Sequence, residues 1–305
     1  MVLKFEKYPF TSILGWSISR FEVFDKCKRR YYYTYYSKFV DDVPGYKLKM
    51  LRDLTSVPLE VGNVIHDVIE AFLRRLQKSD SDIDEDRFYQ FARSKAENLF
   101  KGKTFMETYY NHTDEINFDN VVQRIEKGLT NFIKSPVYSW IYMKAITNRT
   151  NWMIEPPGMG ETRLNGLKAY SKMDFLFPVG DEVHILDWKS GKKDAAKHGL
   201  QLIGYAAAAS SNFNISCKNI FPRIIYLLPE FDEMSVEVSE KELQGFFDTV
   251  KAQTEQMYSY CSNVESNIPI AMERFQKSPS PSVCRYCNYQ ELCFPEGLCD
   301  RETAF

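Results

Sequence analysis

A short apolar segment that ends in paired charges constrains this chain more than any other part of its sequence. Residues 183–189 read Val-His-Ile-Leu-Asp-Trp-Lys, an apolar run of strand length. In a strand, residues i and i+2 point to the same face, so Asp187 and Lys189 project side by side. An acid beside a base adds little to a sheet, but the pair can hold a metal ion and orient a water molecule. The segment therefore predicts a β-strand with a reactive site at its carboxyl end.

The composition is that of an ordinary globular protein. The chain has 305 residues, of which 44% are hydrophobic and 26% are charged. No apolar run is long enough to span a bilayer and the N-terminus lacks an apolar signal segment, so we expect a cytoplasmic protein with no membrane partner. Since the net charge is only −2, any contact with nucleic acid must come from local patches.

The order of secondary-structure signals predicts a mixed α/β protein. Residues 59–77 carry an unbroken apolar stripe at helical spacing, and the region that follows reads as mostly helical. Beyond residue 150 the pattern changes to short strands interrupted by helices. The expected strands are 152–155, 170–177, 183–189 and 223–228, with a hairpin loop at 178–182 and helices at 195–210 and 239–260. We expect a single domain, residues 1–305, in which a helical insertion (80–150) precedes an α/β catalytic core (150–230).

A second carboxylate lies on the strand before the charged pair. Asp174 falls across the hairpin from Asp187, and paired strands can bring two carboxylates within about 5–8 Å of each other. With the backbone carbonyl of Trp188, these carboxylates form the oxygen-rich site that Mg²⁺ or Mn²⁺ prefers. Lys189 can then orient or deprotonate a water molecule, or neutralise charge on a phosphate.

Three further side chains complete the candidate site. Gln201 and Tyr205 are four residues apart on the next helix and share one face, from which they can position Lys189 or a phosphate. His66 lies on the flank of the helix at 59–77, and an imidazole ligand shifts the preference from Mg²⁺ toward Mn²⁺. Each residue alone reads as an ordinary surface or boundary residue, so the prediction depends on their combination.

These motifs resemble those of the PD-(D/E)XK nuclease superfamily, in its RecB-type branch. That branch carries a histidine on an early helix, an Asp, an Asp-x-Lys and then Gln-x-x-x-Tyr. The matching segments are Gly62–His66, Asp174, Asp187–Lys189 and Gln201–Tyr205. The resemblance implies a restriction-endonuclease-like α/β fold and metal-dependent hydrolysis of DNA, and many relatives are exonucleases on single strands or duplex ends. One departure is Lys172, where the family usually has glycine; its side chain can contact a phosphate.

The chain contains no Gly-x₄-Gly-Lys-Ser/Thr motif, so it carries no helicase motor of its own. A helicase or an integrase that works with this protein would be a separate polypeptide. DNA repair, CRISPR spacer acquisition and phage recombination are all compatible with the motifs.

The cysteines form a second motif. Seven cysteines without a signal peptide indicate thiolate chemistry or buried thiols, and not a disulfide framework. Cys284, Cys287 and Cys293 make a Cys-x₂-Cys-x₅-Cys group that needs a fourth ligand, and its spacing describes either a Zn²⁺ site or an iron–sulfur cluster. AddB-like and CRISPR-adaptation relatives hold a 4Fe–4S cluster on such a group and one cysteine ahead of the core. The resemblance therefore implies Cys27, and not Cys299, as the fourth ligand.

A cluster of this kind would act as a clasp that joins the two ends of the chain. It would connect an N-terminal helix at 17–40 to the cysteine segment at 280–299 around the catalytic core, and would contribute to folding.

A basic and aromatic run follows Cys27. Lys28, Arg29 and Arg30 precede five tyrosines between positions 31 and 36. Such a mixture suits single-stranded DNA, with phosphates on the cations and bases on the rings, and Tyr205 is a further candidate for this contact. Alternatively, the tyrosines pack around the cluster and the charges are solvated. Both descriptions can hold for different residues.

Two other functions fit the same motifs. One is a non-catalytic or accessory DNA-binding protein that keeps the fold and an iron–sulfur or zinc site without turnover. The other is a zinc-stabilised interaction protein. The presence of Asp174, Asp187 and Lys189 together favours the nuclease, since a protein without turnover has no need to keep them together.

Overall fold

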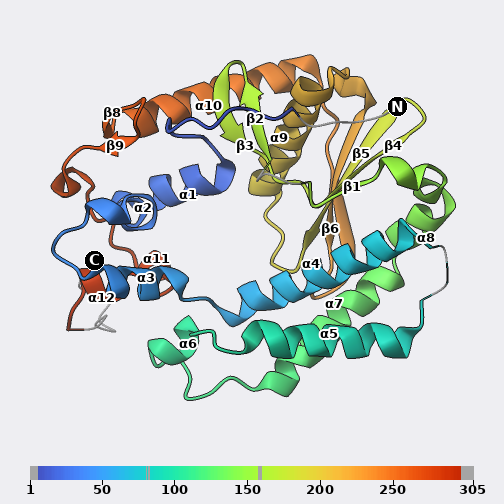
Figure 1. Ribbon diagram of the computed structural model, residues 1–305, viewed down its shortest axis with the longest axis horizontal. Helices are drawn as coiled ribbons and strands as arrows, with labels where there is room; N and C mark the ends of the chain where they lie inside the picture. The colour runs from blue at the N-terminus through green and yellow to red at the C-terminus, as the bar shows by residue number, and fades with distance from the viewer. Residues whose placement is uncertain (1–5, 80, 82, 157–159, 297–305) are drawn as a thin grey trace. The chain divides into compact units, whose positions relative to one another are not determined.

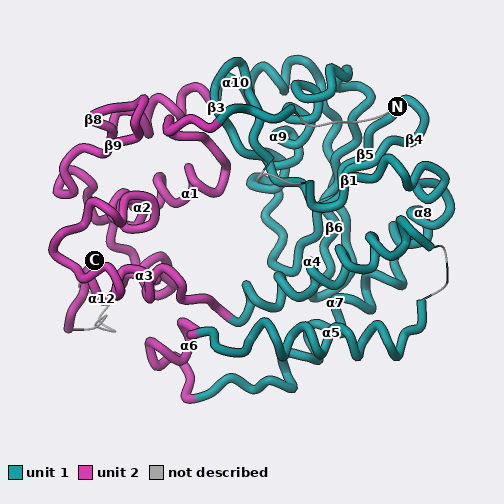
Figure 2. Tube along the Cα trace, in the orientation of Figure 1, with its two compact units in different colours: residues 1–9, 57–103, 115–249 teal, residues 10–56, 104–114, 250–305 magenta. Residues whose placement is uncertain are grey.

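The computed structural model describes residues 6–79, 81, 83–156 and 160–296 of the chain. The chain divides into two compact units (Figure 2). Unit 1 comprises residues 1–9, 57–103 and 115–249, and unit 2 comprises residues 10–56, 104–114 and 250–305. Each unit is therefore built from segments that lie far apart in the sequence.

A five-stranded mixed sheet forms the centre of unit 1 (Figure 1). In spatial order its strands are β1 (Met153–Ile154), β4 (Phe175–Val179), β5 (Glu182–Lys189), β6 (Ile220–Tyr226) and β7 (Asp232–Ser235). β4 and β5 form the antiparallel hairpin expected from the sequence, and β5 pairs in parallel with β6. The mixed α/β fold predicted from the sequence, with a central sheet flanked by helices, is confirmed.

Helices lie against both faces of this sheet, so β5 is buried from Val183 to Trp188 and reads as an apolar run. On one face, the Trp188 ring packs against Phe132 of α7 with ring centroids 5.3 Å apart, in a core shared with α4. On the other face, Tyr205 of α9 contacts Asp187. The helices of unit 1 are α4 (Val57–Leu76), α5 (Glu85–Phe100), α7 (Phe118–Ile133), α8 (Pro136–Met143) and α9 (Ala195–Phe213), with 3₁₀ segments at Ala145–Asn151 and Cys217–Asn219. Helix α10 (Glu240–Tyr258) begins in unit 1 and continues into unit 2 from residue 250.

A small second sheet in unit 1 was not predicted from the sequence. It consists of β2 (Glu161–Leu164) paired antiparallel with β3 (Leu167–Tyr170). The sequence predicts one strand over 170–177, whereas residues 171–174 lie outside both β3 and β4. The chain passes close to itself here: Ser171 N–H donates to the Gly160 carbonyl at 2.8 Å, and a Cβ on Gly160 would lie 2.1 Å from the Ser171 carbonyl oxygen. Asp174 consequently precedes β4 and does not lie within it.

Unit 2 is mostly helical. Its elements are α1 (Ile18–Lys26), α2 (Lys28–Tyr35), α3 (Gly45–Asp53), α6 (Met106–Tyr109), α11 (Pro281–Cys284), α12 (Gln290–Cys293), the short strands β8 (Cys261–Asn263) and β9 (Ile268–Pro269), and 3₁₀ segments at Ser37–Phe39 and Met272–Arg274. The single helix predicted at 17–40 is two helices, because Cys27 between them takes an extended conformation (φ −159°, ψ 113°). The buried rings of Tyr31, Tyr36 and Phe275 form the centre of this unit.

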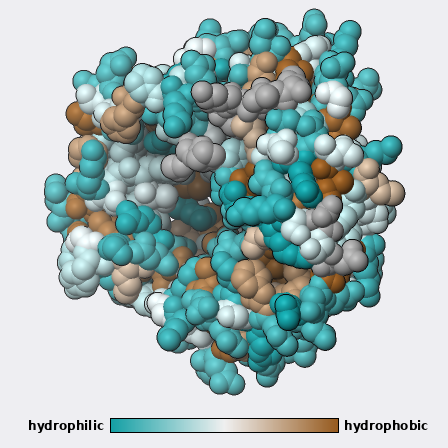
Figure 3. Space-filling view, turned by 45° about the vertical axis from the view of Figure 1, so that its right-hand side comes forward, coloured by the Kyte–Doolittle hydropathy of each residue, from teal (hydrophilic) through white to brown (hydrophobic). Residues whose placement is uncertain are grey.

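The face of the molecule in Figure 3 is mostly hydrophilic, with hydrophobic side chains in scattered patches. Scattered apolar side chains of this kind are normal on a protein surface. No helix in the described part of the chain is long and apolar enough to cross a membrane.

Candidate active site

Asp187 and Lys189 lie at the carboxyl end of β5, as the sequence predicts. The ammonium nitrogen of Lys189 is 2.5 Å from Asp187 Oδ2. At this distance the Lys189 ammonium is itself the charged donor that faces Oδ2, while Oδ1 faces Tyr205. Burial, followed by the negative charge of Asp174, raises the pKa of Asp187 to about 6.

Asp174 is buried beside this pair. The hairpin sets Phe175 opposite Leu186, so the same register extended by one residue sets Asp174 opposite Asp187. Asp174 Oδ2 accepts a hydrogen bond from the Trp188 N–H at 2.8 Å. Burial works to raise the pKa of Asp174, but the charge of His66 and hydrogen bonds from His66 and Trp188 outweigh it, so the pKa is lowered.

His66 reaches the same point from α4. Its Nδ1 is 3.3 Å from Asp174 Oδ2, and its Nε2 donates to the Trp188 carbonyl oxygen at 2.8 Å. Because both ring nitrogens face acceptors, the ring is held as an imidazolium. Burial works to lower the pKa of His66, but the Asp174 carboxylate outweighs it and raises the pKa to about 9. The structure thus brings together three of the predicted metal ligands, including the Trp188 carbonyl.

Gln201 and Tyr205 form a relay on α9. The Tyr205 hydroxyl donates a short hydrogen bond to Asp187 Oδ1, and Gln201 Nε2 donates to the Tyr205 hydroxyl at 2.5 Å. The sequence suggested that this pair positions Lys189 or a phosphate. In the structure, its direct partner is Asp187.

Sequence reasoning missed Glu155, which follows β1. Its backbone N–H donates to the Asp174 carbonyl at 2.8 Å, and its φ of 42° is a left-handed conformation that residues other than glycine rarely adopt. Ligand atoms of His66, Glu155 and Asp174 all lie within 4.8 Å of one another. The signal available in the sequence was a carboxylate at the end of the predicted strand 152–155, the same pattern that singled out Asp187.

Lys172 also belongs to this region. Its ammonium nitrogen is 2.7 Å from Glu155 Oε2, while 62% of its side chain is exposed. The proposed contact of Lys172 with a phosphate therefore requires it to leave or share Glu155. Both residues line an open cleft together with His66, Asn63, Lys189 and Ser190.

The donor set fits a divalent cation. The carboxylate oxygens of Asp174 and Glu155 suit Mg²⁺ and Mn²⁺, and the imidazole of His66 shifts the balance toward Mn²⁺. Asp187, predicted as a ligand from the sequence, is not in the group of ligand atoms that lie within 4.8 Å of one another among the described residues. Since His66 is held as an imidazolium between two acceptors, a cation that used its ring nitrogen would have to displace a proton.

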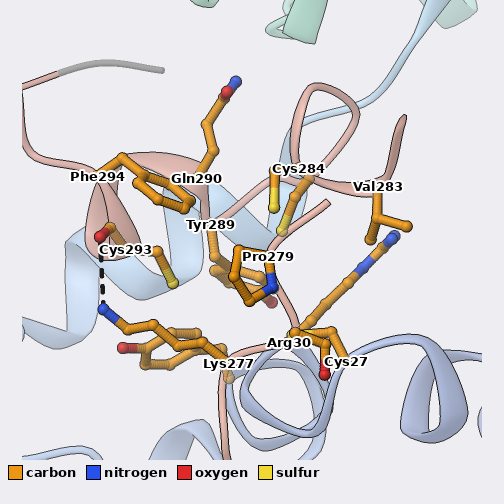
Figure 4. A pocket seen from close by; sticks show the side chains of 13 residues that line it. Cys27, Arg30, Lys277, Pro279, Val283, Cys284, Tyr289, Gln290, Cys293 and Phe294 are labelled. Carbon is orange, nitrogen blue, oxygen red and sulfur yellow. Dashed lines mark hydrogen bonds between the residues drawn. The ribbon is translucent and has the colours of Figure 1, made fainter. Parts of the chain in front are cut away.

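The cysteines predicted as a clasp lie together in unit 2. Cys27, Cys284, Cys287 and Cys293 line one small pocket that Arg30 also lines (Figure 4). Burial raises the pKa of the Cys287 thiol to about 11, so a bound cation would be needed to make it a thiolate at neutral pH. Cys299 lies outside the described residues.

Contacts within unit 2 engage much of the basic and aromatic run. Arg29 Nε donates to the Phe275 carbonyl at 2.9 Å, and Lys28 Nζ donates to the Phe24 carbonyl at 2.7 Å. Four of the five tyrosines, at positions 31, 32, 33 and 36, are buried. These contacts correspond to the packing alternative for most of the run, while Arg30 lines the cysteine pocket.

Comparison with known proteins decides the family. The sequence matches the PD-(D/E)XK nuclease superfamily over residues 15–294, which is most of the chain. The chain belongs to this superfamily. Membership of a nuclease superfamily implies DNA as the substrate.

Two solved structures are similar to this member of the PD-(D/E)XK superfamily at low sequence identity. A protein from Eubacterium rectale with a provisional name as an exonuclease is 13% identical, and the alignment covers 79% of each chain with a TM-score of 0.44. The protein SSO0001 is 16% identical over 63% of this chain and 80% of its own, with a TM-score of 0.31. No protein with curated annotation matches the sequence.

Proposed function

We propose that this protein is a divalent-metal-dependent deoxyribonuclease of the RecB type, whose reaction centre is the carboxyl end of β5. The observation that carries the proposal is the convergence of Asp187, Lys189, Asp174 and His66 from two strand ends and one helix. Convergence of acids, a base and an imidazole in one cleft is typical of a hydrolytic metal site. The superfamily membership supports the same reaction class.

The metal ligands in this proposal are His66, Asp174, Asp187 and the Trp188 carbonyl, with Glu155 as an additional carboxylate. When bound, Mg²⁺ or Mn²⁺ would supply positive charge to the phosphate and lower the pKa of a water molecule.

The remaining groups of the site position Asp187 and the strand end, or neutralise charge on the phosphate. Lys189, held at Asp187, stands where it can neutralise charge on a phosphate oxygen or orient the attacking water. Tyr205 donates a hydrogen bond to the other oxygen of Asp187, and Gln201 donates to the Tyr205 hydroxyl. Asp174 fixes the backbone between Asp187 and Lys189 through the Trp188 N–H.

The preference for single strands or DNA ends rests on the RecB-type resemblance. It is tested with linear single-stranded DNA labelled at the 5′ or the 3′ end and with a circular strand, each incubated with Mn²⁺ and, as a control, with a chelator. We expect metal-dependent shortening of the linear strands and an intact circle. Cleavage of the circle would contradict the exonuclease assignment, and the absence of metal-dependent cleavage on every substrate would contradict the nuclease itself.

A 4Fe–4S cluster held by Cys27, Cys284, Cys287 and Cys293 is the second part of the proposal. Its support is that all four side chains line one pocket although one of them comes from the opposite end of the chain. A zinc site on the same four cysteines is the alternative, since both kinds of site use four cysteine ligands.

A further inference from the structure

Beside Lys189 lies a buried histidine that the proposed reaction does not use. His198 belongs to the beginning of α9, follows the helix N-cap residue Asp194, and is 6% exposed. It contacts the sheet through Tyr226, the last residue of β6. Because β5 and β6 are parallel with Lys189 opposite Tyr226, the two side chains point to the same face of the sheet at its carboxyl end.

The hydrogen bonds of His198 fix its tautomer. Its Nδ1 is 2.5 Å from the Tyr226 hydroxyl and 3.3 Å from the Asp194 N–H. The amide can only donate, so Nδ1 accepts and the ring proton belongs to Nε2. Burial, followed by the nearby positive charge of Lys189, lowers the pKa of His198, so the ring is neutral at pH 7.

The Nε2–H of His198 is a donor with no assigned partner. No residue in the described ranges accepts a hydrogen bond from this N–H. Nε2 is also not fully enclosed by protein atoms. A neutral donor, locked in orientation and set next to the catalytic lysine, is suited to an acceptor that carries charge and arrives from solution.

We propose that His198 is a substrate-positioning residue, whose Nε2–H donates to a phosphate oxygen of the DNA strand next to the phosphate that faces Lys189. Tyr226 has the supporting role of holding the ring and its tautomer. Exposed lysines at positions 192 and 193, in the loop before α9, and at position 197, in its first turn, supply positive charge for a polyanion, although Lys193 is paired with Asp232. The inference rests on the proposed nuclease function and adds to it one specific contact with the phosphodiester backbone.

Two substitutions of His198 distinguish the proposed donation by Nε2–H from the contact of Nδ1 with Tyr226. In His198→Gln, the amide can place an N–H near the position of Nε2. In His198→Asn, the shorter side chain can replace Nδ1 as a partner of Tyr226 but does not reach the position of Nε2. His112→Asn, at an exposed histidine of unit 2, is the matched control.

The experiment measures the affinity of the full-length protein for a fluorescein-labelled single strand, by anisotropy in Ca²⁺, and the steady-state constants in Mn²⁺. We expect His198→Asn to raise Kd and KM by about 10-fold with kcat little changed, since a hydrogen bond to a charged phosphate is lost from ground state and transition state alike. His198→Gln and His112→Asn should stay close to the wild type. Tyr226→Phe should raise Kd by about 3-fold, since the ring is freed but not removed.

Equal weakening by His198→Asn and His198→Gln, with a lower melting temperature for both, would show a structural role and overturn the inference. Wild-type affinity in His198→Asn would overturn it as well. Either result leaves the nuclease proposal standing if the wild-type protein degrades DNA in Mn²⁺. If the wild-type protein does not degrade DNA, the proposed function itself fails, and the inference about its substrate contact fails with it.

Discussion

Asp174 holds the backbone of Trp188: its Oδ2 accepts the Trp188 N–H at 2.8 Å, one residue from each member of the Asp187–Lys189 pair. The same oxygen faces His66 Nδ1 at 3.3 Å. One buried carboxylate therefore sets the position of the strand end and contributes negative charge to the cleft.

These two roles can be separated by substitution. Asp174→Asn keeps an oxygen that can accept the Trp188 N–H but removes the charge, whereas Asp174→Ala removes both. We expect both variants to lose at least about 100-fold in Mn²⁺-dependent cleavage, because the cation loses a charged ligand. Both variants should lose the stability that comes from pairing the charge of Asp174 with His66. Asp174→Ala should be less stable than Asp174→Asn by about 1–3 kcal/mol, because it also leaves a buried N–H without a partner. Urea unfolding measured beside the cleavage assay checks both effects, and equal stability of the two variants would contradict the backbone role.

Tyr205→Phe tests the relay on α9. The change removes the donor to Asp187 Oδ1 and should lower the cleavage rate by about 10-fold, since a hydrogen bond to a buried carboxylate is worth about 1–3 kcal/mol. Tyr142→Phe is the matched control, because the Tyr142 hydroxyl has no hydrogen-bond partner within the described ranges. Similar rates for the two variants would show that the relay does not support the reaction.

The strand β5, its hairpin with β4 and the residues around Asp187 could be predicted from the sequence because their signals are local. A strand of period 2 puts Asp187 beside Lys189, and helical spacing puts Gln201 and Tyr205 on one face. Because β5 is buried on both faces, its residues are mostly apolar up to Asp187, and the change to charged residues marks the end of the strand in the sequence.

The contact of Glu155 with Asp174, the contact of His198 with Tyr226 and the break before Asp174 could not be predicted in the same way. Each depends on a contact between segments distant in the sequence: Glu155 with the Asp174 carbonyl, His198 with Tyr226, and Gly160 with Ser171. The sequence places these residues on elements, but their partners follow only from the packing of those elements.

His184 provides a test of acid sensitivity. Its ring stacks between Phe177 and Phe221 with centroid distances of 5.7 and 5.2 Å, and burial lowers its pKa although Glu182 opposes the effect. The unfolded chain therefore takes up this proton more readily than the folded protein, so the stability contribution of neutral His184 is present above about pH 6.5 and is lost as the pH falls below it. In His184→Phe, the fall in urea midpoint between pH 7.5 and pH 5 should be smaller than in the wild type. An unchanged fall would assign the acid sensitivity to other groups.

The cysteine ligands can be tested by iron analysis. In protein purified without oxygen, we expect about four irons per chain and visible absorbance, and loss of both in Cys27→Ser and Cys287→Ser. Cys299→Ser and Cys217→Ser should keep the iron, since Cys217 is buried in unit 1. Normal iron content in Cys27→Ser, together with loss of iron in Cys299→Ser, would show that Cys299 is the fourth ligand in place of Cys27. One zinc ion per chain and no iron would show that the cysteines form a zinc site and not an iron–sulfur cluster.

The central claim, hydrolysis at the end of β5, is tested most directly by the single-turnover rate at which end-labelled single-stranded DNA is degraded in Mn²⁺. Lys189→Gln removes the ammonium group that lies 2.5 Å from Asp187. The matched control, Lys218→Gln, removes the ammonium group of an exposed lysine that lies just before the start of β6, at the other end of that strand from the site. We predict a rate at least about 100-fold lower in Lys189→Gln and unchanged in Lys218→Gln, because positive charge at the phosphate is worth several kcal/mol in the transition state. A wild-type rate in Lys189→Gln would contradict it.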